Sequence, residues 1–271
     1  MAKNSIRIGN VEILSFSDAV GNFPPANAWP EVSAEAWAAN KQYLGDDGNW
    51  HPNMGCFVVR SSGRTIMVDT GYGPGLDGNL FNAMKASGIS VEDVTTVTFT
   101  HLHPDHVGWN MITEGGKSRP TFPNARYLCP KADFDFFTSE ASLEQFPYIK
   151  EQVLPLVELG LVDYIEPEAD ITSELRVWST PGHTPGHVSI LINSAGEKGV
   201  ILGDVAHTPA QAHETDWNPG FDIVQDQSRA TRHTVFDRIE REGLTVAAGH
   251  FPSPSFGTLV RVEGRRIWQP L

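Results

Sequence analysis

Four residues able to bind a metal ion stand together in the segment 101–106, HLHPDH. His101 and His103 are one residue apart, so in an extended segment their side chains point to the same side and can bind one ion. Asp105 and His106 begin the following turn and can face a second ion beside the first. Imidazole and carboxylate together suit zinc, iron, cobalt or manganese. The segment therefore predicts a metal site.

Six residues cannot complete two coordination shells, so further ligands must come from elsewhere in the chain. Three candidates each follow a predicted strand: His183 in a TPGHTPGH segment, Asp204 in LGD and His250 in a GH pair. Ligand sites of α/β proteins lie preferentially at one edge of the sheet. We therefore expect these three side chains to project from the same edge as His101.

Short apolar runs and glycine-rich turns predict the elements that position these residues. The β-branched run VTTVTFT at 94–100 predicts a buried strand that leads directly to His101. The other expected strands are 6–16, 56–60, 64–68, 125–128, 175–179, 188–192, 199–202, 244–248, 259–262 and 266–268. The expected helices are 76–87, a segment from about Lys131, 147–159 and 227–243. Strands interspersed with helices, without a linker between the halves, indicate a single α/β domain.

The ordered set HxHxDH, TPGHTPGH, GD and GH resembles the metallo-β-lactamase superfamily. The resemblance covers about residues 50–250 and includes the turn Asp69-Thr70-Gly71 after a predicted hairpin. It implies a four-layer αββα sandwich, formed as one domain by residues 1–271, with a metal centre at one edge. It also implies two divalent metal ions, zinc first, with manganese, iron and cobalt as alternatives.

The resemblance assigns the ligands position by position. One ion would be held by His101, His103 and His183, the second by Asp105, His106 and His250, and Asp204 would bridge both. The second histidine of TPGHTPGH, His187, is expected to support the site without binding metal.

The expected chemistry is hydrolysis. Two ions about 3.5–4 Å apart can share a water and lower its pKa from about 15.7 towards about 7. We expect this metal-bridging hydroxide to attack a small ester-like substrate, a lactone or carboxylic ester. Asp105 is expected to carry the proton to the leaving group, and His207 to donate a hydrogen bond to the carbonyl or phosphoryl oxygen. Alternatively, His207 only orients a ligand carboxylate.

The charge balance excludes several partners. Twenty Lys and Arg stand against 33 Asp and Glu, a net charge of −13. Such a surface repels phosphate backbones and anionic lipids, so we expect a small-molecule substrate and neither nucleic acid nor membrane. A homodimer is left open. No apolar run approaches the roughly 18 residues of a membrane span, and residues 1–20 lack the apolar core of a signal peptide, so a cytoplasmic location is expected.

Departures from individual branches narrow the resemblance. Asp204 argues against true β-lactamases, and the acidic charge argues against nucleases. The short segment after His250 leaves no room for the helical domain of glyoxalase II enzymes, and the flavodoxin domain of flavodiiron proteins is not seen. What remains resembles the single-domain lactonases and the related methyl-parathion-hydrolase-like enzymes. The segments 203–207, GDVAH, and 250–252, HFP, are more similar to the second group. A phosphotriester hydrolase is therefore the alternative, ahead of a mononuclear iron persulfide oxidoreductase and a non-catalytic metal-binding module.

Residues 20–55 differ from the rest of the chain in composition. Prolines interrupt the segment, and it contains one phenylalanine and three tryptophans, Phe23, Trp29, Trp37 and Trp50. Long segments of this kind often form lids or substrate rims. We expect a substrate rim here, with a loop merely held to the surface by its tryptophans as the alternative.

Overall fold

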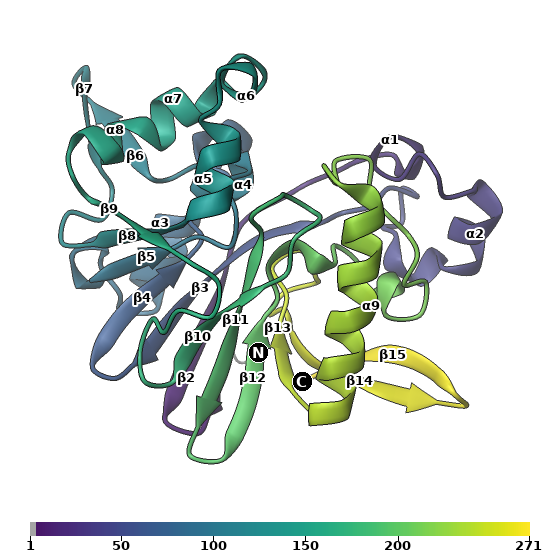
Figure 1. Cartoon of the computed structure of the whole chain (residues 1–271). Coiled ribbons are helices and arrows are strands. Elements are labelled where there is room, and N and C mark those ends of the chain that lie inside the picture. The colour runs from purple at the N-terminus through teal and green to yellow at the C-terminus, as the bar shows by residue number, and fades with distance from the viewer. Residues whose placement is uncertain (1–3) are drawn as a thin grey trace.

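Two β-sheets dominate the computed structural model, which describes residues 4–271 (Figure 1). The seven-stranded sheet has the order β1-β2-β3-β4-β5-β8-β9. Its strands are β1 (Ser5–Ile8), β2 (Val11–Val20), β3 (Asn53–Ser61), β4 (Arg64–Val68), β5 (Thr96–Thr98), β8 (Arg126–Pro130) and β9 (Val162–Ile165). The six-stranded sheet follows chain order from β10 to β15. Its strands are β10 (Leu175–Ser179), β11 (Val188–Ser194), β12 (Glu197–Ile201), β13 (Thr245–Ala247), β14 (Phe256–Val262) and β15 (Arg265–Pro270).

Helices cover the outer faces of both sheets. The seven-stranded sheet is covered by α3 (Leu80–Ala86), α5 (Lys131–Phe137), α6 (Glu140–Gln145), α7 (Tyr148–Gln152) and α8 (Leu154–Glu158). The six-stranded sheet is covered by α9 (Gln225–Glu242). The remaining elements are α1 (Pro25–Ala28), α2 (Ala34–Ala39), α4 (Pro104–Val107) and a hairpin of β6 (Met111–Glu114) and β7 (Lys117–Pro120).

The side chains of β4 show why four layers form. Ile66 and Val68 are buried between the two sheets, and Met67 between them is buried under the helices. Successive side chains of a strand point to opposite faces, so a strand that is apolar at every position must be covered on both sides. The expected αββα sandwich is confirmed.

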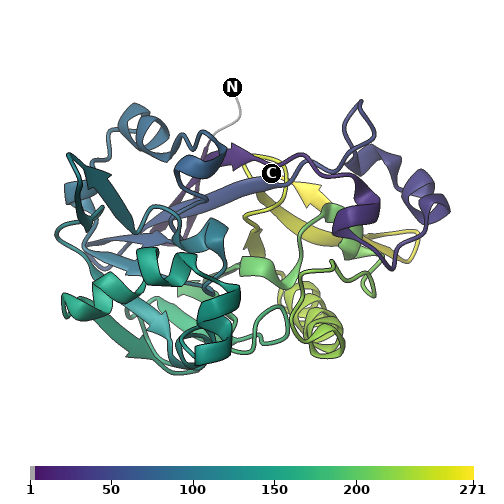
Figure 2. The ribbon, with the colours of Figure 1, turned by 90° about the horizontal axis from the view of Figure 1, so that it is seen from above.

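Parallel pairing at the centre of each sheet brings the ends of several strands to one edge. In the seven-stranded sheet β4, β5, β8 and β9 run parallel, and in the six-stranded sheet β12 and β13 do. His101 follows β5, Asp204 follows β12 and His250 follows β13. Seen from above, the loops after these strands face the space between α5–α8 and α9 (Figure 2).

Two predicted elements are wrong in their extent. The single strand 6–16 is a hairpin of β1 and β2, because the chain turns at Gly9, where φ is +58° and an added Cβ would lie 2.1 Å from Ser194 O. The single helix 147–159 is broken into α7 and α8, because Pro155 has no N–H to continue the hydrogen-bond ladder.

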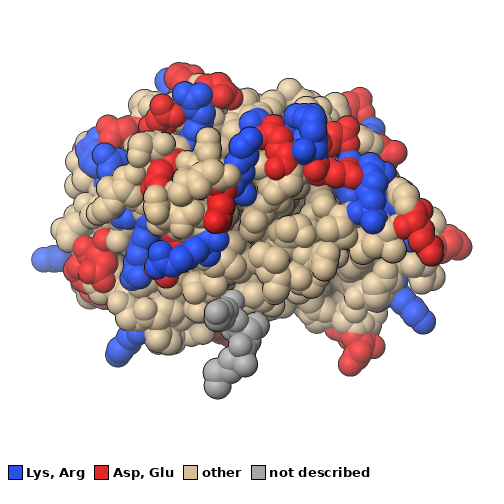
Figure 3. All heavy atoms as spheres, turned by 90° about the horizontal axis from the view of Figure 1, so that it is seen from below, with Lys and Arg blue, Asp and Glu red and all other residues tan. Residues whose placement is uncertain are grey.

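The surface away from the site carries charges of both signs. Figure 3 views the molecule from below, and Lys and Arg side chains lie there among Asp and Glu side chains. None of the helices formed by residues 4–271 has the length and apolar character of a membrane span.

Candidate metal centre

Three imidazoles converge after β5 and in the loop between β10 and β11. His103 Nδ1 lies 3.1 Å from His101 Nε2 and 2.8 Å from His183 Nε2, and the two Nε2 atoms are 3.2 Å apart. Nitrogens that share one tetrahedral zinc at about 2.0–2.1 Å are roughly 3.3 Å apart. The three nitrogens therefore have the spacing of ligands of one ion. We call His101, His103 and His183 the three-histidine set.

A second set stands beside the first. Asp105 Oδ2 lies 3.5 Å from His106 Nε2 and 3.4 Å from His250 Nε2. Asp204 Oδ1 lies 3.4 Å from His106 Nε2, and its Oδ2 lies 2.9 Å from His250 Nε2. We call Asp105, His106 and His250 the mixed set.

Asp204 reaches both sets. Its Oδ2 is 3.3 Å from His183 Nε2 and 3.7 Å from His101 Nε2, in addition to its contacts with His106 and His250. The structure thus brings together all seven residues predicted as ligands.

Unsatisfied polar atoms indicate that these residues fit metal ions. His106 Nε2 and Asp204 Oδ1 are buried and have no hydrogen-bond partner. Buried polar groups are normally paired, and a bound ion accounts for atoms that have no partner within the protein. Donors of imidazole and carboxylate type in this number suit zinc and its first-row neighbours.

The outer nitrogens of three histidines are held by acceptors. His106 Nδ1–H donates to Asp69 Oδ2 at 2.8 Å, His183 Nδ1–H to Asp222 Oδ1 at 2.7 Å, and His250 Nδ1–H to the Asn53 carbonyl at 2.8 Å. Such bonds fix the tautomer and leave Nε2 free as a ligand. Two of these acceptors lie in segments that the sequence singled out, Asp69 in 69–71 and Asn53 in 20–55, but neither contact was foreseen.

His187 takes no part in either set. Its Nε2 accepts the backbone N–H of Asp204 at 2.8 Å, and its Nδ1–H donates to the Thr180 carbonyl at 2.9 Å. Burial, together with the nearby His183, lowers its pKa to about 3, so the ring is neutral and can accept this bond. The ring therefore holds Asp204 by its backbone.

The surroundings favour neutral rings at two residues of the three-histidine set, His101 and His103, but not at the third. Burial and the neighbouring imidazoles lower the pKa of His101 and His103 well below its ordinary value. Burial lowers the pKa of His183, but the carboxylates of Asp204 and Asp222 outweigh it and raise the pKa to about 9. Burial also disfavours the protonated form of His106, but the carboxylates of Asp204, Asp105 and Asp69 outweigh it and raise its pKa. The carboxylates thus attract positive charge to the mixed set.

A cavity of about 310 Å³ opens above the two sets. Its floor contains His103, Asp105, His183, Asp204 and His250. Its walls are mainly apolar and are formed by Phe23, Trp50, Pro52, Met54, Tyr72, Pro104, Phe146, Tyr148 and Phe221. None of the described residues that line it is a lysine or arginine.

His207 also lines this cavity and belongs to a third cluster with His183 and Asp204. Its Nε2 lies 3.1 Å from Asp204 Oδ2, and its ring stacks on that of His250 with centroids 5.1 Å apart. Its Nδ1 is buried without a partner. Burial lowers its pKa to about 4, so the ring is neutral.

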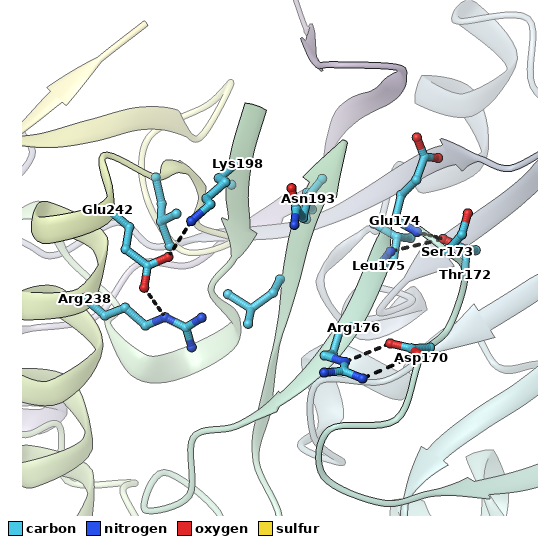
Figure 4. A pocket seen from close by; sticks show the side chains of 14 residues that line it. Asp170, Thr172, Ser173, Glu174, Leu175, Arg176, Asn193, Lys198, Arg238 and Glu242 are labelled. Atoms are coloured by element: carbon cyan, nitrogen blue, oxygen red, sulfur yellow. Dashed lines mark hydrogen bonds and ion pairs between the residues drawn. The ribbon is translucent and has the colours of Figure 1, made fainter. Parts of the chain in front are cut away.

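A second cavity, of about 290 Å³, lies on the outer face of β10–β12 beside α9 (Figure 4). Five of its six charged side chains are paired with one another, Lys198 and Arg238 with Glu242 and Arg176 with Asp170. The sixth, Glu174, accepts from the hydroxyls of Ser61 and Ser194. It contains no histidine among its described residues, so we assign the chemistry to the cavity above the metal sets.

The segment 20–55 contributes one wall of the site and a core of its own. Trp29, Trp37 and Trp50 are 0–4% exposed and pack with Ala28. Trp50 and Phe23 line the cavity, whereas Trp29 is not part of its lining. The segment folds into α1, α2 and a short 3₁₀ turn around these buried tryptophans, and its role as a substrate rim stays a prediction.

The remaining histidines lie outside both sets. His51 pairs with Asp47 and His233 with Asp216, both at partly exposed positions. His213 is the C-cap residue of the 3₁₀ turn 209–212; its side chain is 4% exposed, and its Nε2 contacts Asn40 Oδ1 at 2.8 Å.

The chain belongs to the metallo-β-lactamase superfamily, whose family model matches residues 56–250. It is a metal-dependent hydrolase, as its relatives indicate. An N-acyl homoserine lactonase of Bacillus thuringiensis is 25% identical over 218 residues, 72% of this chain and 80% of the relative. The lactonase AttM of Rhizobium radiobacter is 28% identical over 190 residues, 67% of this chain and 68% of the relative.

Solved structures share the whole fold. The hydrolase AbOPH of the β-lactamase superfamily superposes with a TM-score of 0.88 at 26% identity, covering 98% of this chain and 96% of that one. AidC, a dizinc quorum-quenching lactonase, superposes with a TM-score of 0.86 at 22% identity over 98% and 96% of the two chains. The predicted family and enzyme class are confirmed.

Proposed function

We propose that this protein is a dinuclear zinc-dependent hydrolase that opens a small, uncharged lactone or carboxylic ester. The observation that carries the proposal is the position of Asp204, whose two carboxylate oxygens contact both ligand sets on the floor of an aromatic cavity. The lactonase relatives support this substrate class.

The three-histidine set would hold one ion and the mixed set the other, with Asp204 shared. When bound, such ions would lower the pKa of a coordinated water and polarise the substrate's carbonyl oxygen. Side chains of the cavity wall bind the rest of the substrate. The rings of Phe23, Phe146 and Phe221 exclude water and bind the apolar part of the substrate.

Asp105 and His207 are the two residues that we assign to the reaction in addition to metal binding. Asp105 lines the cavity and is more exposed than Asp204, so it can carry a proton to the leaving group. The Nε2 atom of His207 lies 3.1 Å from Asp204 Oδ2. With its Nε2–H turned to the substrate it donates to the oxygen that becomes negative, and with Nε2–H on Asp204 it orients the bridging carboxylate.

The lining favours an uncharged substrate. The ions would offer positive charge only at the floor of the cavity. An anionic group bound against the walls would leave water without a cationic partner, because the described lining has no lysine or arginine. Phosphotriesters are also uncharged, and this property of the cavity keeps a phosphotriester hydrolase as the second candidate. A mononuclear iron oxidoreductase would leave the mixed set unused, although His106 Nε2 there is buried and unpaired.

A hydrolysis screen tests the proposal. Zinc-loaded protein is assayed with apolar lactones, aryl carboxylic esters and phosphotriesters, and with each ester carrying an added carboxylate. We expect turnover of lactones or esters above phosphotriesters and a large loss of kcat/KM for every anionic analogue. Preference for phosphotriesters would select the second candidate, and no hydrolysis of any class would refute both. Asp204→Ala protein is the control for contaminating activity.

A further inference from the structure

Arg232 of α9 is fully buried beside the metal centre. A guanidinium is tolerated inside a protein only when its N–H groups all find acceptors. Its acceptors, at 2.7–3.3 Å, are Val205 O, Thr215 O, Trp217 O, Asn218 Oδ1, Asp222 Oδ2 and Ser228 Oγ. The guanidinium therefore ties α9 to the segment 205–222, which directly follows Asp204.

Asp222 is the one carboxylate among these acceptors, and it also contacts a histidine of the metal centre. Its Oδ2 accepts from Arg232 at 3.3 Å, and its Oδ1 accepts from His183 Nδ1 at 2.7 Å. The side chains of Arg232 and Asp222 are 0% exposed, so water does not compete for these bonds. The chain of contacts runs from a buried cation through a carboxylate to a predicted ligand.

The backbone holds Asp222 in place against the same loop. Ile223 N–H donates to the His183 carbonyl at 2.9 Å, and Val224 N–H donates to the Gly182 carbonyl at 2.9 Å. Gly182 has φ +135°, and an added Cβ would lie 2.2 Å from the amide nitrogen of Ser228 in α9. The His183 loop and the start of α9 are thus in direct backbone contact.

We propose that Arg232 and Asp222 are positioning residues, which hold His183 with its Nε2 towards His101 and His103 and thereby set the metal affinity of the three-histidine set. Arg232 balances the buried charge of Asp222, and Asp222 fixes the ring and tautomer of His183. The inference rests on the metal centre of the proposed function but not on its substrate.

The mixed set has a separate support, which provides a matched control. Asp69 accepts from His106 Nδ1, and its other contacts are the backbone N–H and hydroxyl of Thr100, both at 2.8 Å. No arginine takes part. Asp69 is therefore a buried carboxylate with the same relation to a histidine, but in the other ligand set.

The experiment compares Asp222→Asn with Asp69→Asn in the full chain. Asparagine keeps the size of the side chain, but its amide cannot accept from both His183 and Arg232. Metal-free protein is titrated with cobalt against a competing chelator, and the ion at each set is located by anomalous diffraction at limiting cobalt. We expect Asp222→Asn to weaken the three-histidine set by about 10-fold to 100-fold and Asp69→Asn to weaken the mixed set.

A second variant and a spectroscopic signal guard against loss of folding. Arg232→Lys keeps the charge but cannot reach all the acceptors, and we expect it to weaken the same set as Asp222→Asn. In both variants the Nδ1–H proton resonance of His183 should shift or exchange faster, while that of His106 stays unchanged. Equal affinities of folded Asp222→Asn and parent protein, or equal weakening of both sets, would overturn the inference. A parent chain that binds no ion would refute the proposed function and this inference with it.

Discussion

At the scale of single residues, the metal centre depends on carboxylates that each serve two partners. Asp204 lies between the two ligand sets, and Asp222 lies between His183 and Arg232. Both side chains are buried, so the loss of one partner leaves the other unsatisfied. This arrangement makes the effects of single substitutions specific to a ligand set.

Asp204→Ala should remove ions from both sets, because the Asp204 carboxylate contacts histidines of each. His250→Ala should remove mainly the ion of the mixed set, because His250 contacts Asp105 of that set and the shared Asp204. Metal analysis per chain measures both effects: we expect loss of about two ions in the first variant and about one in the second. Full occupancy in Asp204→Ala protein would remove the bridging assignment.

His207→Ala should lower kcat by about 10-fold to 100-fold, because one donor to a developing oxyanion is lost while the metals remain. Metal content should stay at the parent value if the ring acts on the substrate. Loss of an ion would instead assign His207 to the orientation of Asp204, its neighbour at 3.1 Å. His213→Ala, a buried histidine outside the cavity, is the control.

At the scale of elements, the segments around the sheets divide into those that hold the site and those that line it. The segment 20–55 does both, since Trp29 packs in its core and Phe23 lines the cavity at 38% exposure. The start of α5 holds the site from the other side. Asp133 accepts from the backbone N–H groups of Leu102 and Gly186, one in each segment that carries the three-histidine set.

Trp29→Ala and Phe23→Ala should therefore differ in kind. Removing the fully buried Trp29 should lower the free energy of unfolding by about 3–5 kcal/mol. Removing the half-exposed Phe23 should leave stability nearly unchanged and raise KM for bulky apolar substrates by roughly 10-fold, with little effect on small ones. Denaturant unfolding and steady-state kinetics check the pair. Equal KM of Phe23→Ala and parent protein for all substrates would contradict the rim prediction.

Asp133 should make stability depend on pH. Burial raises its pKa to about 6, against the opposing hydrogen bonds from Thr184, Gly186 and Leu102. The folded chain then binds the proton more tightly than the unfolded chain, whose Asp pKa is about 3.9. This contribution to stability is fully present below about pH 4 and is lost as the pH rises towards about 6, by about 3 kcal/mol. Unfolding of metal-free parent and Asp133→Asn protein between these pH values should show that fall in the parent alone; parallel profiles would contradict it.

At the scale of the whole molecule, the metal centre takes its residues from the loops of both sheets. The three-histidine set takes His101 and His103 from the seven-stranded sheet and His183 from the six-stranded sheet. The mixed set likewise combines His106 with His250. Ions bound there would link both halves of the chain.

Metal removal should therefore lower the stability of the entire fold. A ligand bound only by the folded state contributes about 2.7 kcal/mol at 100 times its Kd. For a chain of this size each kcal/mol corresponds to about 2–4 °C in Tm. Calorimetry with and without chelator should show a fall of several degrees that zinc reverses, together with about two zinc ions per chain in the reloaded protein. An unchanged Tm would exclude this stabilising role.

From its local patterns the sequence predicted an α/β domain and a metal site at 101–106, and the family resemblance added the αββα sandwich and the set of seven predicted ligands. Alternating apolar runs specify strands, and HxHxDH places four donors within one short segment whatever the rest of the chain does. The supports and walls were decided by the tertiary structure. His183 meets Asp222 across 39 residues, and His250 meets Asn53 across 197. Such contacts follow from the packing of the two sheets and α9, and no spacing in the chain encodes them.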